Sequence, residues 1–217
     1  MRIRILTNAR ALLVLAAATA AAAPAGAQEF IEEFTAVSAN VREPGQPVRI
    51  YVLDWSSENA RERLVTALNP PPPEPIPEAA EGRGGRGGRG GRGGRGGRGA
   101  EPVDPVMAAL AEAPTVGYIW TDQVAGYAIR YAYRAPLPGG GERIILVTNR
   151  RLGVHTTLWD PVATDYGFTL MEIRLNADGK GEGKASLTAE VVVDANAGVP
   201  ALDDYDGALI VLEDVRR

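Results

Sequence analysis

Length, composition and charge exclude several classes of protein at the outset. The 217 residues are 45% hydrophobic and contain no cysteine, which excludes disulfide scaffolds, thiolate metal sites and thiolate catalysis. The single histidine excludes a metal site built on two histidines. The formal net charge of −4 argues against broad binding of nucleic acid or anionic membranes by the folded part of the chain.

An export signal is predicted over residues 1–27. A basic start, an apolar stretch and a small-residue cleavage site follow one another, formed by Arg2, Arg4 and Arg10, by residues 11–23, and by Ala25-Gly26-Ala27. The apolar stretch has about 13 residues, whereas a membrane-spanning helix needs roughly 20. We therefore expect a cleaved signal rather than an anchor, a mature chain that begins at Gln28, and a periplasmic or extracellular location. No later segment is apolar over the length of a span.

Two strands and a helix are predicted next. Residues 34–41 and 48–53 alternate between apolar and polar side chains, with Thr35 and Val37 expected on one face, and a Pro/Gly-rich turn separates them. A helix is predicted from residue 58 to about residue 68, capped by Ser56 or Ser57, because its apolar residues recur at helical spacing.

Residues 69–103 are predicted to be a disordered insertion. Consecutive prolines end the preceding helix, and Arg-Gly-Gly repeats follow from Gly82 to Gly99. This composition lacks the apolar residues needed for a core. Asp104 and Pro105 then cap a second short helix over 106–112. The insertion therefore joins two helices within one β-rich domain over 28–217 rather than separating two domains.

The second half of the chain is predicted to be mainly strand. Its alternating or apolar segments cover residues 116–121, 126–134, 142–148, 166–175, 182–193 and 208–215. Together with the first pair they give about eight short strands with hairpin-length connections. We expect a mainly β (α+β) fold, a single antiparallel meander that forms a barrel or a sandwich and carries two short helices. The barrel is favoured because closure removes exposed sheet edges.

Several short segments resemble a group of secreted bacterial proteins to which no activity is assigned. They are Asp54-Trp55-Ser56-Ser57, Arg61-Glu62-Arg63-Leu64, Val116-Gly117-Tyr118-Ile119, Gly126-Tyr127 with Tyr131-Ala132, residues 165–175, and Gly181-Glu182-Gly183-Lys184. The resemblance covers most of residues 30–193 and implies an exported one-domain protein. It implies no catalytic residue, cofactor or partner, and the Arg-Gly-Gly insertion departs from it.

Three tyrosines are the first candidate ligand-binding residues. Tyr127, Tyr131 and Tyr133 are spaced two residues apart in a predicted strand, so alternation places them on one face. If that face lines a hollow barrel, the rings would contact a small apolar ligand. If the barrel is filled, the same rings belong to its core.

His155 and Trp159 are the other candidates. His155 lies in the connection over 150–165, close to Trp159 and Asp160, but the chain lacks the Gly-x-Ser-x-Gly motif of many serine hydrolases. A pair of carboxylates for glycoside hydrolysis is a further alternative, with Glu172 and Glu190 as candidates. Alternating strands also explain both glutamates as outward-facing polar positions.

Metal ions, cofactors and nucleic acid are not expected to take part in the function. Asp203, Asp204 and Asp206 cluster in a predicted loop, but Ca²⁺ needs six to eight oxygen ligands in a shaped site. The Arg-Gly-Gly repeats carry no interleaved phenylalanine or tyrosine for stacking on bases, and export removes the chain from most RNA. A linker, or attraction of the repeats to an acidic surface, are the other interpretations.

The sequence therefore favours an exported, non-enzymatic β-domain that binds a small apolar ligand or a component of the cell envelope. The alternative is a secreted hydrolase that uses His155 or a carboxylate pair. An assembly role through an open sheet edge is a third hypothesis.

Overall fold

The computed structural model describes residues 29–71, 104–121, 124–152, 166–187 and 189–217. Its first elements are β1 (Glu32–Ser38), β2 (Pro47–Val52), α1 (Glu58–Leu68), α2 (Pro105–Glu112), β3 (Gly117–Thr121) and β4 (Val124–Pro136). They are followed by β5 (Glu142–Thr148), β6 (Thr169–Leu175), β7 (Lys180–Ala185), β8 (Val191–Asp194), β9 (Val199–Leu202) and β10 (Ile210–Arg216). Within these residues, no helix has the length and hydropathy needed to cross a membrane.

Eight strands form a closed antiparallel barrel in the order β1-β10-β7-β6-β5-β4-β3-β2, and β8 and β9 form a separate two-stranded sheet. The prediction of a mainly β barrel with two short helices is confirmed. Chain neighbours are also neighbours in the barrel except where β8 and β9 intervene between β7 and β10. Because the barrel is closed, its described strands leave no open edge.

Side chains fill the barrel interior, as expected for a barrel of eight strands. The interior core consists of buried residues from all eight strands, among them Phe34, Ile50, Ile129, Ile144, Leu146, Met171, Ile173 and Leu212. On β1 the buried residues are Phe34, Ala36 and Ser38, while Thr35 is exposed and Val37 is only half-buried. Thr35 and Val37 therefore share one face, as the alternation predicts, and it is the outer face. The strand ends at Ser38 rather than residue 41.

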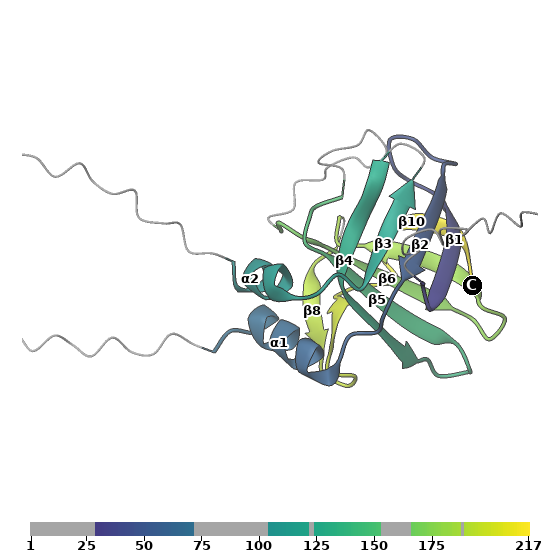
Figure 1. The fold of residues 1–217 in the computed structure, drawn as a ribbon. Helices are drawn as coiled ribbons and strands as arrows, with labels where there is room; N and C mark the ends of the chain where they lie inside the picture. Colours follow the sequence, from purple (N-terminus) through teal and green to yellow (C-terminus); the bar gives the residue numbers. More distant parts are fainter. Residues whose placement is uncertain (1–28, 72–103, 122–123, 153–165, 188) are drawn as a thin grey trace, which may run out of the picture.

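A second hydrophobic core lies outside the barrel. α1, α2, β8 and β9 all pack on its β4–β6 side, and Figure 1 shows the two helices side by side on this flank next to β8. Residues of the barrel wall meet residues of these covering elements in one cluster, which includes Tyr131, Ile145, Val147, Leu170, Leu64, Val106, Leu110, Val199 and Leu202. We call this flank the covered wall.

α1 has the predicted bounds, and α2 begins one residue earlier than predicted, at Pro105, and ends at Glu112 as predicted. Ser57 caps α1 by accepting a hydrogen bond from the Ala60 amide, and Asp104 caps α2 by accepting one from the Val106 amide. Leu64 is the buried residue of α1, and Ala67 and Leu68 pack partly against the outer core. The helices are connected in sequence through residues 72–103, which lie outside the described residues.

The region after β7 differs from the predicted pattern. A single strand over 182–193 and a loop over 194–206 were expected, but β7 ends at Ala185 and β8 and β9 form a hairpin over the covered wall. Gly198 closes this hairpin at a φ of +62°, a left-handed conformation that favours glycine. The alternating valines of β8 belong to this outer sheet, so strand periodicity alone did not show where the barrel strand ended.

Candidate functional site

Tyr131 lies at the point where both helices are attached to the barrel. Ser56, just before α1, donates its amide to the Ala132 carbonyl at 2.8 Å, and its hydroxyl accepts the Ala132 amide at 3.0 Å. Arg130 Nη1 donates to the carbonyl of Ala113, just after α2, at 2.8 Å. The residues on either side of Tyr131 therefore fix the start of one helix and the end of the other.

A bulge in β4 directs the Tyr131 ring outward. The pairing of β4 with β5 shifts register between Ile129 and Tyr131. Such an extra residue reverses the face to which the following side chains point. Tyr127 and Ile129 accordingly belong to the interior core, whereas Tyr131 belongs to the outer core.

The three tyrosines predicted as ligand-binding residues thus do not share one face. Tyr127 is buried inside the barrel, and Tyr131 and Tyr133 lie on the covered wall, with ring centroids 6.2 Å apart and ring planes at 10°. Their even spacing in the sequence hides the bulge, because both sides of β4 are apolar and suit an aromatic ring.

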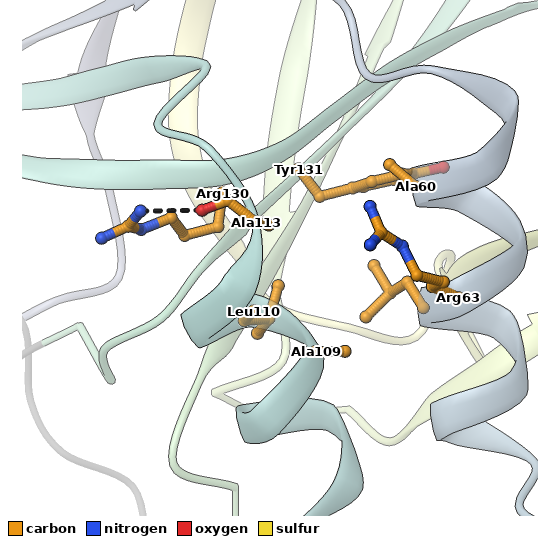
Figure 2. A pocket seen from close by; sticks show the side chains of 8 residues that line it. Ala60, Arg63, Ala109, Leu110, Ala113, Arg130 and Tyr131 are labelled. Carbon is orange, nitrogen blue, oxygen red and sulfur yellow. Dashed lines mark hydrogen bonds between the residues drawn. The ribbon is translucent and has the colours of Figure 1, made fainter.

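A cleft between α1 and α2 opens onto Tyr131. We call it the helix-pair cleft and define it by its lining residues Ala60, Arg63, Leu64, Ala109, Leu110, Ala113, Arg130 and Tyr131. Counting its mouth, the cleft contains about 260 Å³ of empty space. Its enclosed part has room for about one water molecule. Figure 2 shows the Tyr131 hydroxyl directed toward α1 near Ala60, with the Arg63 guanidinium reaching toward the ring.

One hydrogen-bond donor inside this cleft lacks an acceptor. The Tyr131 side chain is 1% exposed, and its hydroxyl has no hydrogen-bond partner among the described residues. Arg130 Nε also lacks a partner, but Figure 2 shows the Arg130 guanidinium directed away from the Tyr131 hydroxyl. In the described part of the chain, no carboxylate is among the lining residues. The cleft therefore combines apolar walls with donors and suits a group that accepts hydrogen bonds.

The Tyr131 phenol stays protonated. Burial raises its pKa, and the neighbouring Tyr133 adds to the shift. A phenol with a raised pKa keeps its proton throughout the ordinary pH range and is available as a donor. The hydroxyl can therefore bind an acceptor at neutral pH without first changing its ionisation.

Charged residues hold the β8–β9 hairpin against the same wall. We call this set the charged clamp and define it as Arg143, Glu172, Arg174, Lys184, Asp194 and Tyr205. Glu172 Oε1 lies 3.0 Å from both Arg143 Nε and Arg174 Nε, and Oε2 accepts from the Leu202 amide at 3.2 Å. The Arg143 Nε contact is an ion pair without hydrogen-bond geometry, whereas Arg143 Nη2 donates to Oε2 at 3.1 Å.

The clamp continues through Asp194 and Tyr205. Arg143 Nη1 donates to Asp194 Oδ2 at 2.7 Å, and this bond, helped by two backbone amides, lowers the pKa of the Asp194 carboxyl. The Arg174 guanidinium carbon lies 3.7 Å from the centre of the Tyr205 ring, and Lys184 Nζ lies 4.6 Å from it. These contacts fasten the hairpin and the turn after it to the barrel.

The two glutamates considered as a pair for hydrolysis lie in different surroundings. Glu172 was expected to face outward. Its side chain does point away from the barrel interior, but the β8–β9 hairpin covers it and its exposure is 0%. A general acid needs a raised pKa, whereas that of Asp194 is lowered. Glu190 is exposed and contributes its carbonyl to the Asp203 amide.

The remaining candidates are placed as follows. His155 and Trp159 lie outside the described residues. Asp203, Asp204 and Asp206 are exposed, and Asp204 caps its own turn by accepting the Gly207 amide at 2.9 Å. Among the described residues, no group of three or more acidic or histidine side chains is arranged to hold a metal ion.

Sequence reasoning missed the helix-pair cleft as a unit and the clamp altogether. Tyr131 was among the candidates, but nothing local to it indicates that the helices flank it. For the clamp a signal was present, because Arg143, Glu172 and Lys184 occupy outward positions of consecutive strands with alternating charge. Opposite charges that repeat across neighbouring strands indicate a cross-strand ion network.

Comparison with known proteins adds no relative to these observations. The chain matches no protein-family model, and neither the curated proteins nor the solved structures give a significant match. The resemblance to a group of secreted bacterial proteins therefore stays an expectation, and the geometry of the covered wall is what bears on function.

Proposed function

We propose that the protein is an exported, non-enzymatic binding module and that the helix-pair cleft takes a small amphipathic acid. The observation that carries this proposal is the Tyr131 hydroxyl, buried at the bottom of the cleft without an acceptor. Export rests on the predicted signal over residues 1–27.

The donors of the cleft indicate which part of the ligand enters first. A buried hydroxyl without a partner costs about 1–3 kcal/mol. A carboxylate oxygen placed beside the Tyr131 hydroxyl would recover that free energy, because it accepts a hydrogen bond and is attracted by the guanidinium of Arg63, which also lines the cleft. Water can fill the same position in the absence of ligand.

The walls of the cleft indicate the rest of the ligand. Ala60 and Leu64 on α1 face Ala109, Leu110 and Ala113 on α2, and small side chains leave space between the helices. An unbranched or flat apolar group fits against such walls better than a polar one. The enclosed space is small, so we expect the head group to be inside and most of the apolar part to lie along the mouth.

Two probes with the same chain test the head group. Octanoate and 1-octanol would be titrated into the chain that begins at Gln28, with binding followed by calorimetry and by shifts of backbone amides in NMR spectra. We expect octanoate to bind at least about tenfold more tightly, since a charged carboxylate accepts a stronger hydrogen bond from the Tyr131 hydroxyl than an alcohol oxygen does and is attracted by Arg63. Equal affinities, or amide shifts confined to residues away from α1, α2 and β4, would contradict the proposal.

A matched pair of variants tests the residue. Tyr131→Phe keeps the ring and removes the donor, so we expect the dissociation constant for octanoate to rise about 5- to 30-fold. Tyr133→Phe is the control, because Tyr133 stacks on Tyr131 but does not line the cleft. A similar loss in both variants would indicate that packing, not hydrogen bonding, determines the affinity.

A further inference from the structure

The tip of the β8–β9 hairpin is hydrogen-bonded both to α1 and to the barrel. Arg61 on α1 donates from Nη1 to the carbonyl of Gly198 in the tip. Asp194, at the other end of the tip, accepts with Oδ2 from Nη1 of Arg143 on β5 at 2.7 Å. Figure 1 shows that α1 lies next to both α2 and β8. The tip therefore connects the charged clamp to the helix that forms one wall of the helix-pair cleft.

Hydrogen bonds within the tip join its two ends. Asp194 Oδ1 accepts the amides of Asn196 and Ala197 at 2.9 and 3.2 Å, and the Asp194 carbonyl accepts the Gly198 amide at 2.7 Å. One carboxylate oxygen of Asp194 thus holds the turn while the other holds the barrel. A side chain that binds Gly198 is therefore tied to the barrel through Asp194.

Gly198 leaves the space that the Arg61 guanidinium occupies. A Cβ atom built on Gly198 would lie 2.9 Å from Arg61 Nη1, closer than side chains pack. Arg61 Nε also donates to Glu58 Oε1 at 2.9 Å, and the Arg61 side chain is only 19% exposed. The guanidinium is therefore held between its own helix and the hairpin rather than extended into solvent.

Arg61 ties the body of α1 to the rest of the fold. The start of the helix is attached to β4 through Ser56. Among the described residues, no other side chain of α1 forms a hydrogen bond to another element. Leu64, one turn after Arg61, lines the cleft and packs in the outer core. Without Arg61, apolar packing alone would determine how far this part of α1 lies from α2.

We propose that Arg61 is a positioning residue of the helix-pair cleft and that, through the hairpin tip, it makes the cleft selective for unbranched acids. Arg61 does not line the cleft, so it acts through the position of α1 and not by touching the ligand. The enclosed part of the cleft has room for about one water molecule, so a small shift of α1 changes which groups fit. This inference rests on the proposed function and adds the shape of the ligand to it.

Two isomeric acids test the selectivity. Octanoate and 2-propylpentanoate have the same carboxylate and the same number of carbon atoms, but only the second is branched next to the carboxylate. We expect the chain that begins at Gln28 to bind octanoate about tenfold more tightly, since the branch would have to enter the enclosed part of the cleft. Equal affinities for the two isomers in the unaltered protein would overturn the proposal.

A substitution at Arg61 tests the residue. Arg61→Met keeps an apolar stem and removes the donors to Gly198. We expect the dissociation constant for octanoate to rise about 3- to 10-fold, because loss of one such hydrogen bond leaves α1 in its binding position for only a fraction of the time. The preference for octanoate over its isomer should fall below about threefold, since a wider cleft admits the branch. An unchanged preference would overturn the proposal.

Glu58→Gln is the matched control. It removes the charged partner of Arg61 within α1 but leaves the contact between Arg61 and Gly198. Both dissociation constants should change less than about twofold. If Glu58→Gln lost the preference as Arg61→Met does, the stability of the helix would determine selectivity, and the proposal would be wrong.

A double-mutant cycle tests whether Arg61 acts through the hairpin tip. Asp194→Asn loses the charged contact with Arg143, so we expect it to raise the dissociation constant for octanoate about two- to fivefold. In the Arg61→Met background the same substitution should have no further effect, because the tip is no longer bonded to α1. Effects that add in full would show that the two residues act independently and would overturn the proposal.

Hydrogen exchange without ligand separates this proposal from the proposed function. Arg61→Met should speed the exchange of α1 amides at least about threefold and leave that of the barrel strands unchanged, and circular dichroism would verify that each variant is folded. Unchanged exchange in α1 would overturn the positioning role even if octanoate binds. If the unaltered protein bound neither acid, the proposed function would fail, while faster exchange in α1 would still support the positioning of α1 by Arg61.

Discussion

The covered wall and the flank formed by β1, β2 and β3, which we call the open wall, belong to one barrel. They differ in which groups pair with their polar side chains and in which elements cover their apolar side chains. On the covered wall, helices and a hairpin bury Tyr131 and Ile145, and the charged clamp pairs buried side chains with one another. On the open wall, Thr35 and Arg49 are exposed, and the apolar residues Phe30, Ile31 and Trp120 also stay partly exposed.

This difference shows how a closed barrel with a filled interior can still bind. Because side chains fill the interior core, only the outward-facing side chains of the strands remain to form binding sites. Where added elements cover them, they form an outer core with a cleft at the junction of two helices. Where nothing described covers them, they form a surface. Substitutions on the two walls should therefore differ in their effect on stability.

The largest difference is expected for buried charge. Glu172→Ala leaves Arg143 and Arg174 without their shared carboxylate, and removal of one partner from a buried ion pair costs about 3–5 kcal/mol. Glu33→Ala on β1 of the open wall should change the free energy of unfolding by less than about 0.5 kcal/mol. Urea unfolding of both variants measures the contrast. A cost below about 1 kcal/mol for Glu172→Ala would mean that the clamp contributes little.

A smaller contrast is expected for apolar side chains. Leu110 on α2 is 1% exposed and packs in the outer core, so Leu110→Ala should lower the free energy of unfolding by about 2–4 kcal/mol. Leu209 is 52% exposed, and Leu209→Ala should be nearly neutral. The same unfolding curves test both. If Leu110→Ala were also neutral, α2 would not be part of the cooperative unit.

The barrel and its helices could be predicted because their signals are local. Alternating strands, capping residues and turn residues repeat over short distances, and the expected helix over 58–68 matches α1 in both of its bounds. The number of strands and their short connections left a barrel and a sandwich open, and the barrel was favoured because closure removes exposed sheet edges. The alternation on β1 was predicted, but it did not show that Thr35 and Val37 face outward, because Phe34 and Ala36 alternate just as regularly.

The covered wall could not be predicted in the same way because its defining contacts are distant in sequence. The β4 bulge leaves the spacing of the tyrosines unchanged, so only the register with β5 shows that Tyr131 changes sides. Glu172 alternates like a surface residue, and its burial depends on a hairpin about 20–30 positions later. A strand pattern gives the alternation of faces but not what covers each face.

Alkaline pH separates the buried phenols of the covered wall from the rest of the protein. Burial raises the pKa of Tyr131 and of Tyr205 above the ordinary value near 10. The unfolded chain therefore loses these protons first as pH rises, so stability is complete below about pH 10 and falls above it. Each phenol should contribute a slope of up to about 1.4 kcal/mol per pH unit.

Unfolding at a series of pH values measures that slope. Replacing both Tyr131 and Tyr205 with Phe should remove most of the alkaline loss that they cause, while the stability profile on the acid side stays as it was. An unchanged alkaline slope in the double variant would show that other groups control unfolding at high pH.

The smallest effect distinguishes the two phenols from each other at neutral pH. The Tyr205 hydroxyl donates to the Glu182 carbonyl at 3.2 Å, so Tyr205→Phe should cost about 1 kcal/mol. The Tyr131 hydroxyl has no partner among the described residues, so Tyr131→Phe should be neutral or stabilise the protein by up to about 1 kcal/mol. With octanoate present, the unaltered protein should be more stable than Tyr131→Phe, because only the tyrosine hydroxyl gains a hydrogen bond to the ligand. If Tyr131→Phe lowered the free energy of unfolding without ligand, bound water would already be accepting the hydrogen bond of the hydroxyl. A carboxylate would then gain less free energy by replacing that water.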